Sequence, residues 1–136
     1  ITTSVGVCDG EPTTQVRVTW TNDAPADAGT TLPPYVTANG FYGVPPGSIG
    51  TLITVYGPEG ATASHIDRDG EQESVQTTLL GTRAAVQHEV VLAPGESSTI
   101  TLEYQGAGAG ERLTVVDHTP MIDDPEISRE ELQCAS

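Results

Sequence analysis

The side chains best suited to acid–base chemistry or metal binding in this sequence are three histidines, His65, His88 and His118. Successive histidines are 23 and 30 residues apart, so no two have the close spacing of a metal-ligand motif. His88 shares the apolar face of a predicted strand with Val86 and Val90, which is typical of a core histidine. We therefore expect structural or surface roles for all three.

Nucleophilic catalysis finds little support in the sequence. Serine, histidine and acids are present, but the Gly-x-Ser-x-Gly turn of serine hydrolases is absent, and Gly47-Ser48-Ile49-Gly50 has the wrong spacing. The chain contains no lysine, which excludes Schiff-base chemistry. The glycines of residues 106–110 match no phosphate-binding motif. We predict that the protein is not an enzyme.

Two acidic groups raise the question of calcium binding. The first, residues 67–71 (DRDGE), begins like an oxygen-ligand loop but fails the EF-hand pattern, so a tight turn is favoured. The second could supply several oxygens at one end of the fold. Its members are Asp117, Asp123, Asp124 and Glu126. A solvated acidic tail is the favoured interpretation of this group. We expect no cofactor, with calcium as the open alternative.

The two cysteines, Cys8 and Cys134, lie near opposite ends of the sequence and are too few for a zinc motif. We expect a disulfide that ties the C-terminal tail to the first strand, with two unpaired thiols as the alternative. A disulfide indicates an oxidising, extracytoplasmic compartment.

The charge balance excludes whole classes of partner. The chain has 136 residues and a formal net charge of −14, with 19 acidic residues against 5 arginines. Such a field repels nucleic acid and anionic membrane surfaces. No stretch approaches the ~20 apolar residues of a membrane span. Because the chain starts at Ile1 rather than Met, we expect a fragment of a longer protein.

Strand patterns dominate the sequence. Apolar residues alternate with polar ones along residues 16–21, 86–92 and 99–104, and residues 52–56 are apolar on both faces, as in a central strand. Weaker strands are predicted at Thr3–Val7, Ala61–Ile66, Ser74–Leu80 and Leu113–Val116. The pattern predicts a single all-β domain over residues 1–136. We expect an immunoglobulin-like antiparallel β-sandwich of about 7–8 strands, with a jelly roll or small barrel as the alternative.

Turn residues separate these strands. Asp69-Gly70 predicts a tight hairpin, and Pro94-Gly95 predicts a type II turn that joins two strands into a hairpin. The glycines of residues 106–110 predict a flexible loop. One short helical turn is expected near the C-terminus, where Asp124 could act as a cap and Ser128–Glu131 spells a capping box. The tail at residues 117–136 is acidic.

A long loop at residues 22–50 is rich in proline and glycine and has no strand pattern. Loops of this length in compact domains are often functional. It holds three of the six aromatic residues of the chain, Tyr35, Phe41 and Tyr42. These rings could form a contact surface. We favour the alternative that they fold back over one end of the sandwich, because a chain so poor in aromatics needs them for packing.

Several stretches of the chain resemble the C-terminal extracytoplasmic region of a family of large, single-span surface proteins. These proteins occur in high-GC Gram-positive bacteria, and the region is a domain of unknown function. The stretches are Trp20–Pro25 (WTNDAP), Leu32–Thr37 (LPPYVT), Gly43–Gly47 (GVPPG) and Thr51–Ala61 (TLITVYGPEGA). The resemblance covers roughly residues 13–105. It implies a cell-surface location within a membrane-anchored protein, and it brings no known activity or catalytic residues.

These observations together predict a non-enzymatic, extracytoplasmic structural or interaction module of a bacterial cell-envelope protein. The expected partner is another protein or an envelope polysaccharide, and not nucleic acid or a membrane. The alternative function is a carbohydrate- or polymer-binding module assisted by calcium.

Overall fold

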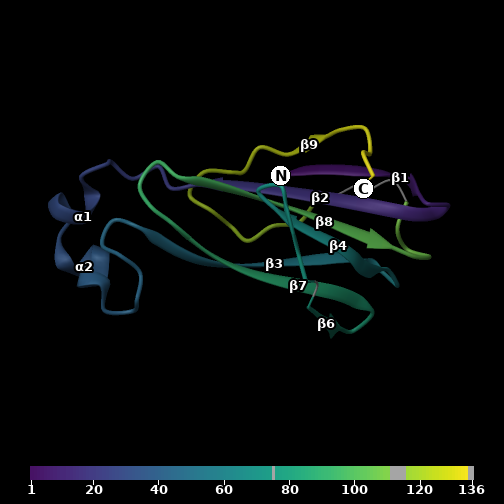
Figure 1. The fold of residues 1–136 in the computed structure, drawn as a ribbon, viewed down its shortest axis with the longest axis horizontal. Helices are drawn as coiled ribbons and strands as arrows, with labels where there is room; N and C mark the ends of the chain where they lie inside the picture. Colours follow the sequence, from purple (N-terminus) through teal and green to yellow (C-terminus); the bar gives the residue numbers. More distant parts are fainter. Residues whose placement is uncertain (75, 111–115, 135–136) are drawn as a thin grey trace.

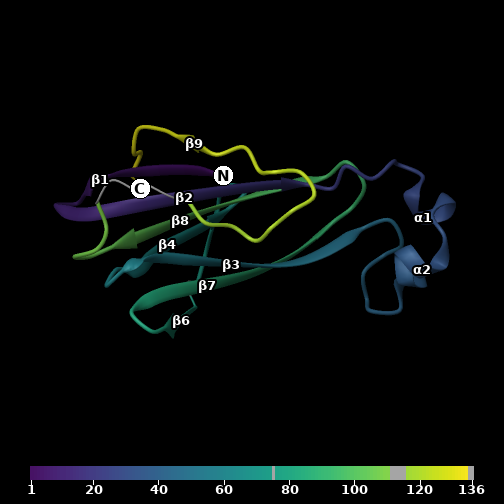
Figure 2. The same cartoon turned by 180° about the vertical axis from the view of Figure 1, so that it is seen from behind.

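The computed structural model describes residues 1–74, 76–110 and 116–134, and they form a β-sandwich of two sheets (Figures 1 and 2). The larger sheet has the strand order β5-β4-β8-β2-β1-β9 and the smaller one β3-β7-β6. The strands are β1 (Thr2–Cys8), β2 (Glu11–Thr21), β3 (Ile49–Glu59), β4 (Thr62–Arg68), β5 (Glu71–Glu73), β6 (Thr77–Leu80), β7 (Arg83–Leu92), β8 (Ser97–Gln105) and β9 (Ser128–Arg129). The predicted all-β sandwich is confirmed. The described strands exceed the predicted number because β5 and β9 were not expected.

The alternating patterns found in the sequence mark the buried faces of the central strands. On β7 the even-numbered residues from Ala84 to Leu92 are buried, and on β8 those from Ser98 to Tyr104. The weaker predictions Thr3–Val7 and Ala61–Ile66 correspond to β1 and β4. Of the predicted strand Ser74–Leu80, only its second half is a strand, β6. The predicted strand Leu113–Val116 lies outside the described residues except for Val116, which is in no strand.

Strand β3 corrects one prediction. Its double-sided apolar pattern predicted a central strand, but β3 lies at the edge of the smaller sheet and pairs with β7. Its second apolar face is not buried as in a strand covered on both faces, since Leu52 is 62% and Tyr56 52% exposed.

The core lies between the two sheets, and Tyr104 of β8 connects them. Its side chain is fully buried, and its hydroxyl donates a hydrogen bond to the carbonyl of Val55 in β3 (2.9 Å). Burial raises the pKa of this hydroxyl well above its usual value, so it stays a donor. Gly57 leaves room for the ring, because a Cβ there would lie 2.3 Å from the Cδ1 atom of Tyr104. Around this ring pack Ile66, Val86, Ile100 and Leu102.

The turn at Pro94-Gly95 has the predicted type but a different role. Gly95 has φ +78°, and the Glu96 amide donates to the carbonyl of Ala93 (2.9 Å), as in a type II turn. The predicted hairpin is wrong, because β7 belongs to the smaller sheet and β8 to the larger one. Each of these strands has a continuous buried face, so they pack face to face across the core instead of pairing edge to edge.

The turn at Asp69-Gly70 joins β4 and β5 as a two-residue hairpin, as predicted, with both residues at positive φ. The Asp69 carboxylate also contacts β8, where it accepts hydrogen bonds from the Thr99 amide (2.7 Å) and the Ser98 hydroxyl (2.8 Å). The Thr99 hydrogen bond, followed by that of Ser98, lowers the pKa of Asp69 below its usual 3.8.

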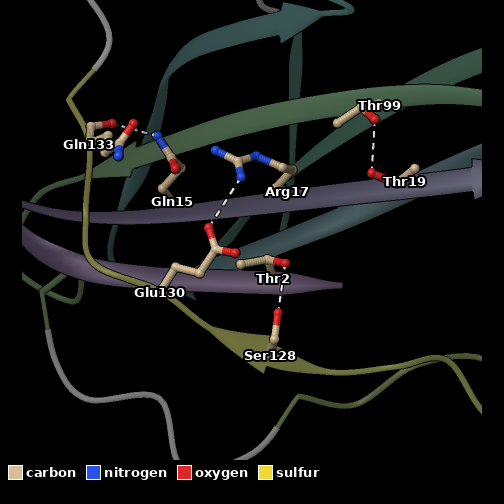
Figure 3. Close-up of polar contacts among 8 residues, drawn as sticks. All are labelled: Thr2, Gln15, Arg17, Thr19, Thr99, Ser128, Glu130 and Gln133. Carbon is tan, nitrogen blue, oxygen red and sulfur yellow. Dashed lines mark hydrogen bonds and ion pairs between the residues drawn. The ribbon is translucent and has the colours of Figure 1, made fainter.

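The C-terminal segment, residues 128–134, runs along the larger sheet (Figure 3). Its first residues form β9, which pairs in parallel with β1. The helical turn predicted at Ser128–Glu131 is therefore wrong, because pairing with the open edge of β1 satisfies this backbone. Further along, the Gln133 carbonyl accepts a hydrogen bond from Gln15 (2.9 Å), and Glu130 pairs with Arg17 (3.3 Å).

The predicted disulfide between Cys8 and Cys134 is present and fixes the end of this segment to the end of β1. The segment packs closely against β1, since a Cβ at Gly6 would lie 2.9 Å from the Leu132 side chain. Within the described part of the chain, no helix is long and apolar enough to span a bilayer.

Replacing both cysteines by alanine should lower the free energy of unfolding by about 2–5 kcal/mol, because the disulfide closes a loop between residues 126 positions apart. Denaturant unfolding measures this change. As a control, wild-type protein in reducing agent should match the C8A/C134A variant. An unchanged midpoint in both cases would show that the crosslink contributes nothing to stability.

The Asp69→Asn variant should be less stable than wild type above pH 3.8, where the wild-type carboxylate is ionised and accepts both hydrogen bonds. Since the folded-state pKa is lowered, this contribution is lost as the pH falls through that pKa, and the two proteins should converge in strong acid. Unfolding free energies across the acid range test this prediction. Glu71→Gln at the first residue of β5 is the control, and a difference that persists in acid contradicts the linkage.

Candidate functional site

The candidate site is the loop that connects β2 to β3 and projects beyond the ends of the strands, on the left in Figure 1. It contains two helices of four residues, α1 (Ala28–Thr31) and α2 (Pro34–Thr37), and a 3-10 turn at Ala38–Gly40. The sequence predicts no helix here. These turns are too short to show a helical repeat, and the proline at the start of α2 was the one available signal.

The base of the loop is fixed by Asn22, which is 3% exposed at the end of β2. Its side-chain amide donates to the carbonyls of Gly47 and Leu92, both at 3.0 Å. Its backbone pairs with the turn after β7, where Gly95 donates to its carbonyl (2.7 Å) and Glu96 accepts from its amide (2.9 Å). One residue therefore holds the end of the loop against both sheets.

The two arms of the loop contact each other through backbone atoms. A Cβ at Gly29 would lie 2.6 Å from the Pro46 carbonyl oxygen, and a Cβ at Gly47 would lie 2.6 Å from the Gly29 nitrogen. Ala28 is fully buried beside this contact. The approach requires glycine on both sides, so these two glycines fix the spacing of the arms.

A left-handed turn directs the end of the loop outward. Ala38 and Asn39 both have φ +49°, and Gly40 follows at φ +75°. The turn is closed by the Phe41 amide, which donates to the Ala38 carbonyl (2.9 Å), and by Asn39, whose amide donates to the Thr37 hydroxyl. Left-handed φ is unfavourable for alanine, and backbone strain of this kind is often found at functional positions.

We refer to Tyr35, Phe41 and Tyr42 as the aromatic tip. The three side chains are 88%, 83% and 81% exposed. The favoured expectation that they cover the end of the sandwich is therefore wrong. Backbone hydrogen bonds and glycine contacts close the loop without them, and the core is filled by Tyr104 and its aliphatic neighbours. Phe41 and Tyr42 instead contact each other edge to face, with ring centroids 5.2 Å apart and planes at 89°.

The stretch of sequence that carries the aromatic tip is free of charge. No Asp, Glu, Lys, Arg or His occurs from Ala28 to Pro58, in a chain of net charge −14. Within the loop and β3, the acids lie only at the two ends of this stretch, at Asp23 and Asp27 before it and at Glu59 after it. An apolar partner could approach here without desolvating an ionised group.

The three histidines are not brought together. His88 is buried in the sandwich, with its Nδ1 3.5 Å from the Glu73 carboxylate and its ring 6.5 Å from that of Trp20. His65 lies near Gln72, and His118 lies in the exposed segment before β9. His88 occupies the core position predicted from its apolar face.

The acidic residues considered for calcium lie exposed before β9. They are Asp117, Asp123, Asp124 and Glu126. Across residues 1–74, 76–110 and 116–134, no three His, Cys, Asp or Glu side chains gather in a way that could hold a metal ion. The Asp67–Glu71 group forms the β4–β5 turn.

Comparisons of the chain with protein-family models, with curated proteins and with solved structures found no match.

Asn22→Asp should lower the free energy of unfolding by about 2–4 kcal/mol, because a carboxylate would face the Gly47 and Leu92 carbonyls with no proton to donate. The matched control is Asn39→Asp at the exposed left-handed turn, where we expect a change within about 0.5 kcal/mol. Denaturant unfolding of both variants measures the difference, and equal effects would contradict the role assigned to Asn22.

Proposed function

We propose that this chain is a non-enzymatic, extracytoplasmic interaction module of a bacterial cell-envelope protein, and that it binds a partner protein through the aromatic tip. The observation that carries the proposal is the exposure of Tyr35, Phe41 and Tyr42 on a loop whose base is fixed to the sandwich. Aromatic side chains supply much of the energy of protein interfaces when a partner buries them.

The construction of the loop supports binding over a merely passive connection. Its base is held by Asn22, and its arms are held by the contact of Gly29 with Gly47. A loop that is already ordered loses less conformational entropy when it binds, so more of the contact energy contributes to affinity. A connection of this length without a role would not need exposed rings.

The extracytoplasmic assignment is supported by the disulfide between Cys8 and Cys134, since such bonds persist in oxidising compartments. The resemblance of the loop and of β3 to surface proteins of high-GC Gram-positive bacteria points to the cell envelope.

A protein partner is favoured over a polysaccharide by the arrangement of the rings. Phe41 and Tyr42 are perpendicular, so they form a protruding knob and not one flat surface for stacking on sugar rings. An envelope polysaccharide is the alternative ligand. The calcium-assisted version has no assembled ligand set among the described residues.

The triple variant Y35A/F41A/Y42A should keep the melting temperature of the wild type, because the three side chains are more than four-fifths exposed. It should also lose binding to envelope proteins by at least about tenfold, a change of about 1.4 kcal/mol. Surface biosensor titrations measure the affinity of each variant for fractionated envelope proteins and, separately, for purified envelope polysaccharide.

The control for this experiment is Leu79→Ala, which removes a side chain that is 70% exposed on β6, far along the sequence from the tip. This variant should bind as wild type does. Undiminished binding by the triple variant, or its unfolding, would contradict a tip-mediated function, and binding to the polysaccharide fraction alone would favour the alternative ligand.

A further inference from the structure

The strands at the sheet edges of this protein differ in length and charge. Among the described strands, four lie at an edge: β5 and β9 in the larger sheet, and β3 and β6 in the smaller one. β5 has three residues, two of them glutamates, β9 has two residues, and β6 has four. β3 has eleven. Proteins commonly protect edges by making them short or charged, and β3 is long and carries its one charge at its last residue, Glu59.

The composition of β3 makes it a good template for an added strand. From Ile49 to Gly57 it contains no charged residue and no proline, and it is rich in β-branched side chains. Near its end, the Val55 carbonyl already accepts the Tyr104 hydroxyl, and the register is irregular between Tyr56 and Glu59. The open part of the edge is therefore Ile49–Thr54.

The core is incompletely covered along this strand. Ile53 and Val55 pack against the core from β3 but are only partly buried, whereas their partners on β7, His88 and Val86, are 9% and 2% exposed. A further strand beside β3 would cover the open side of these residues. Each apolar side chain so covered would add to the stability of the pair.

We propose that β3 pairs antiparallel with β3 of a second copy of this chain, about a twofold axis at Thr51. This pairing places Thr51 opposite Thr51, Ile49 opposite Ile53, and Gly50 opposite Leu52. All three kinds of pair are compatible with a sheet, and two facing threonines can hydrogen-bond. The two small sheets become one sheet across the axis. This inference goes beyond the proposed function, because it uses β3 and not the aromatic tip.

A second copy offers β3 a strand of the same length that is likewise uncharged from Ile49 to Gly57. Two molecules of net charge −14 repel each other, and the uncharged run from Ala28 to Pro58 is the part of the sequence where they can meet with least repulsion. An edge that binds its own sequence satisfies the backbone groups of both strands at once. The remaining repulsion between the two acidic bodies is screened by salt, so association strengthens as ionic strength rises.

Sedimentation equilibrium of the 136-residue chain tests the proposal. The wild type should dimerise, with a dissociation constant roughly tenfold lower in about 500 mM than in about 20 mM NaCl. Thr51→Glu should weaken the dimer by at least about tenfold, because two carboxylates would face each other across the axis. Thr78→Glu on the exposed edge strand β6 is the matched control and should change the constant by less than about threefold.

A cross-linking measurement keeps the test independent of the stability of Thr51→Glu. Under oxidising conditions, Thr51→Cys should form a disulfide-linked dimer, since directly opposed residues in antiparallel strands lie close enough. Thr78→Cys should stay monomeric. Failure of Thr51→Cys to cross-link would overturn the twofold axis at Thr51.

Three further results would overturn the proposal: a monomer at every concentration and salt level, equal weakening by Thr51→Glu and Thr78→Glu, or loss of the dimer in Y35A/F41A/Y42A. The last result would place self-association at the aromatic tip. Thr51→Glu should leave partner binding by the tip intact, so failure of the dimer and failure of the proposed function are distinguishable.

Discussion

The buried amide of Asn22 is the interaction on which the candidate site depends. It lies where β2 ends and the long loop begins, and it donates to the carbonyl of Gly47 at the far end of the loop and to that of Leu92 at the end of β7. The backbone of the same residue pairs with the turn after β7. A hydrophobic residue could fill this space but could not donate to the carbonyls of Gly47 and Leu92, which would lose these two hydrogen bonds. Because the amide satisfies them, the loop can project as an ordered structure while its aromatic side chains remain in solvent. The three rings can stay exposed although the core is small, because the base of the loop is held without them.

The sandwich itself is held together by contacts of different kinds on its two sides. Between the sheets, Tyr104 contributes both a large buried ring and a hydrogen bond to Val55, so apolar packing and polar satisfaction occur in one residue. On the outer face of the larger sheet, the C-terminal segment adds polar contacts to Gln15 and Arg17 and ends at the disulfide. Cross-strand hydroxyl pairs such as Thr19 with Thr99 continue along the same face (Figure 3). A chain with few large apolar residues thus uses several modest interactions in place of one large core.

Local patterns in the sequence predicted what depends on local physics. Alternation identified β2, β7 and β8, Asp69-Gly70 identified a hairpin, and two cysteines in an acidic chain without other ligands identified a disulfide. What failed depends on contacts that are distant in sequence. The residues around Pro94 look the same whether the next strand pairs beside β7 or packs across the core from it. Ser128–Glu131 reads as a capping box until the open edge of β1 is available. For the aromatic tip, the sequence identified the three residues but did not predict that they are exposed. The backbone contacts of Gly29 and Gly47, which close the loop without the rings, cannot be recognised in a hydrophobic pattern.

The disulfide also determines how this chain would respond to mechanical tension. Cys8 and Cys134 are near the two ends of the sequence and are joined covalently. A pull applied to the two ends travels along β1, crosses the sulfur–sulfur bond and leaves through the last residues, so residues 9–133 lie outside the path of the force. The sandwich and its projecting loop would keep their shape while tension is applied to the two ends of the chain. In this arrangement, the disulfide would carry the tension and the folded sandwich would not. Reduction of the Cys8–Cys134 bond would transfer the tension to the whole fold.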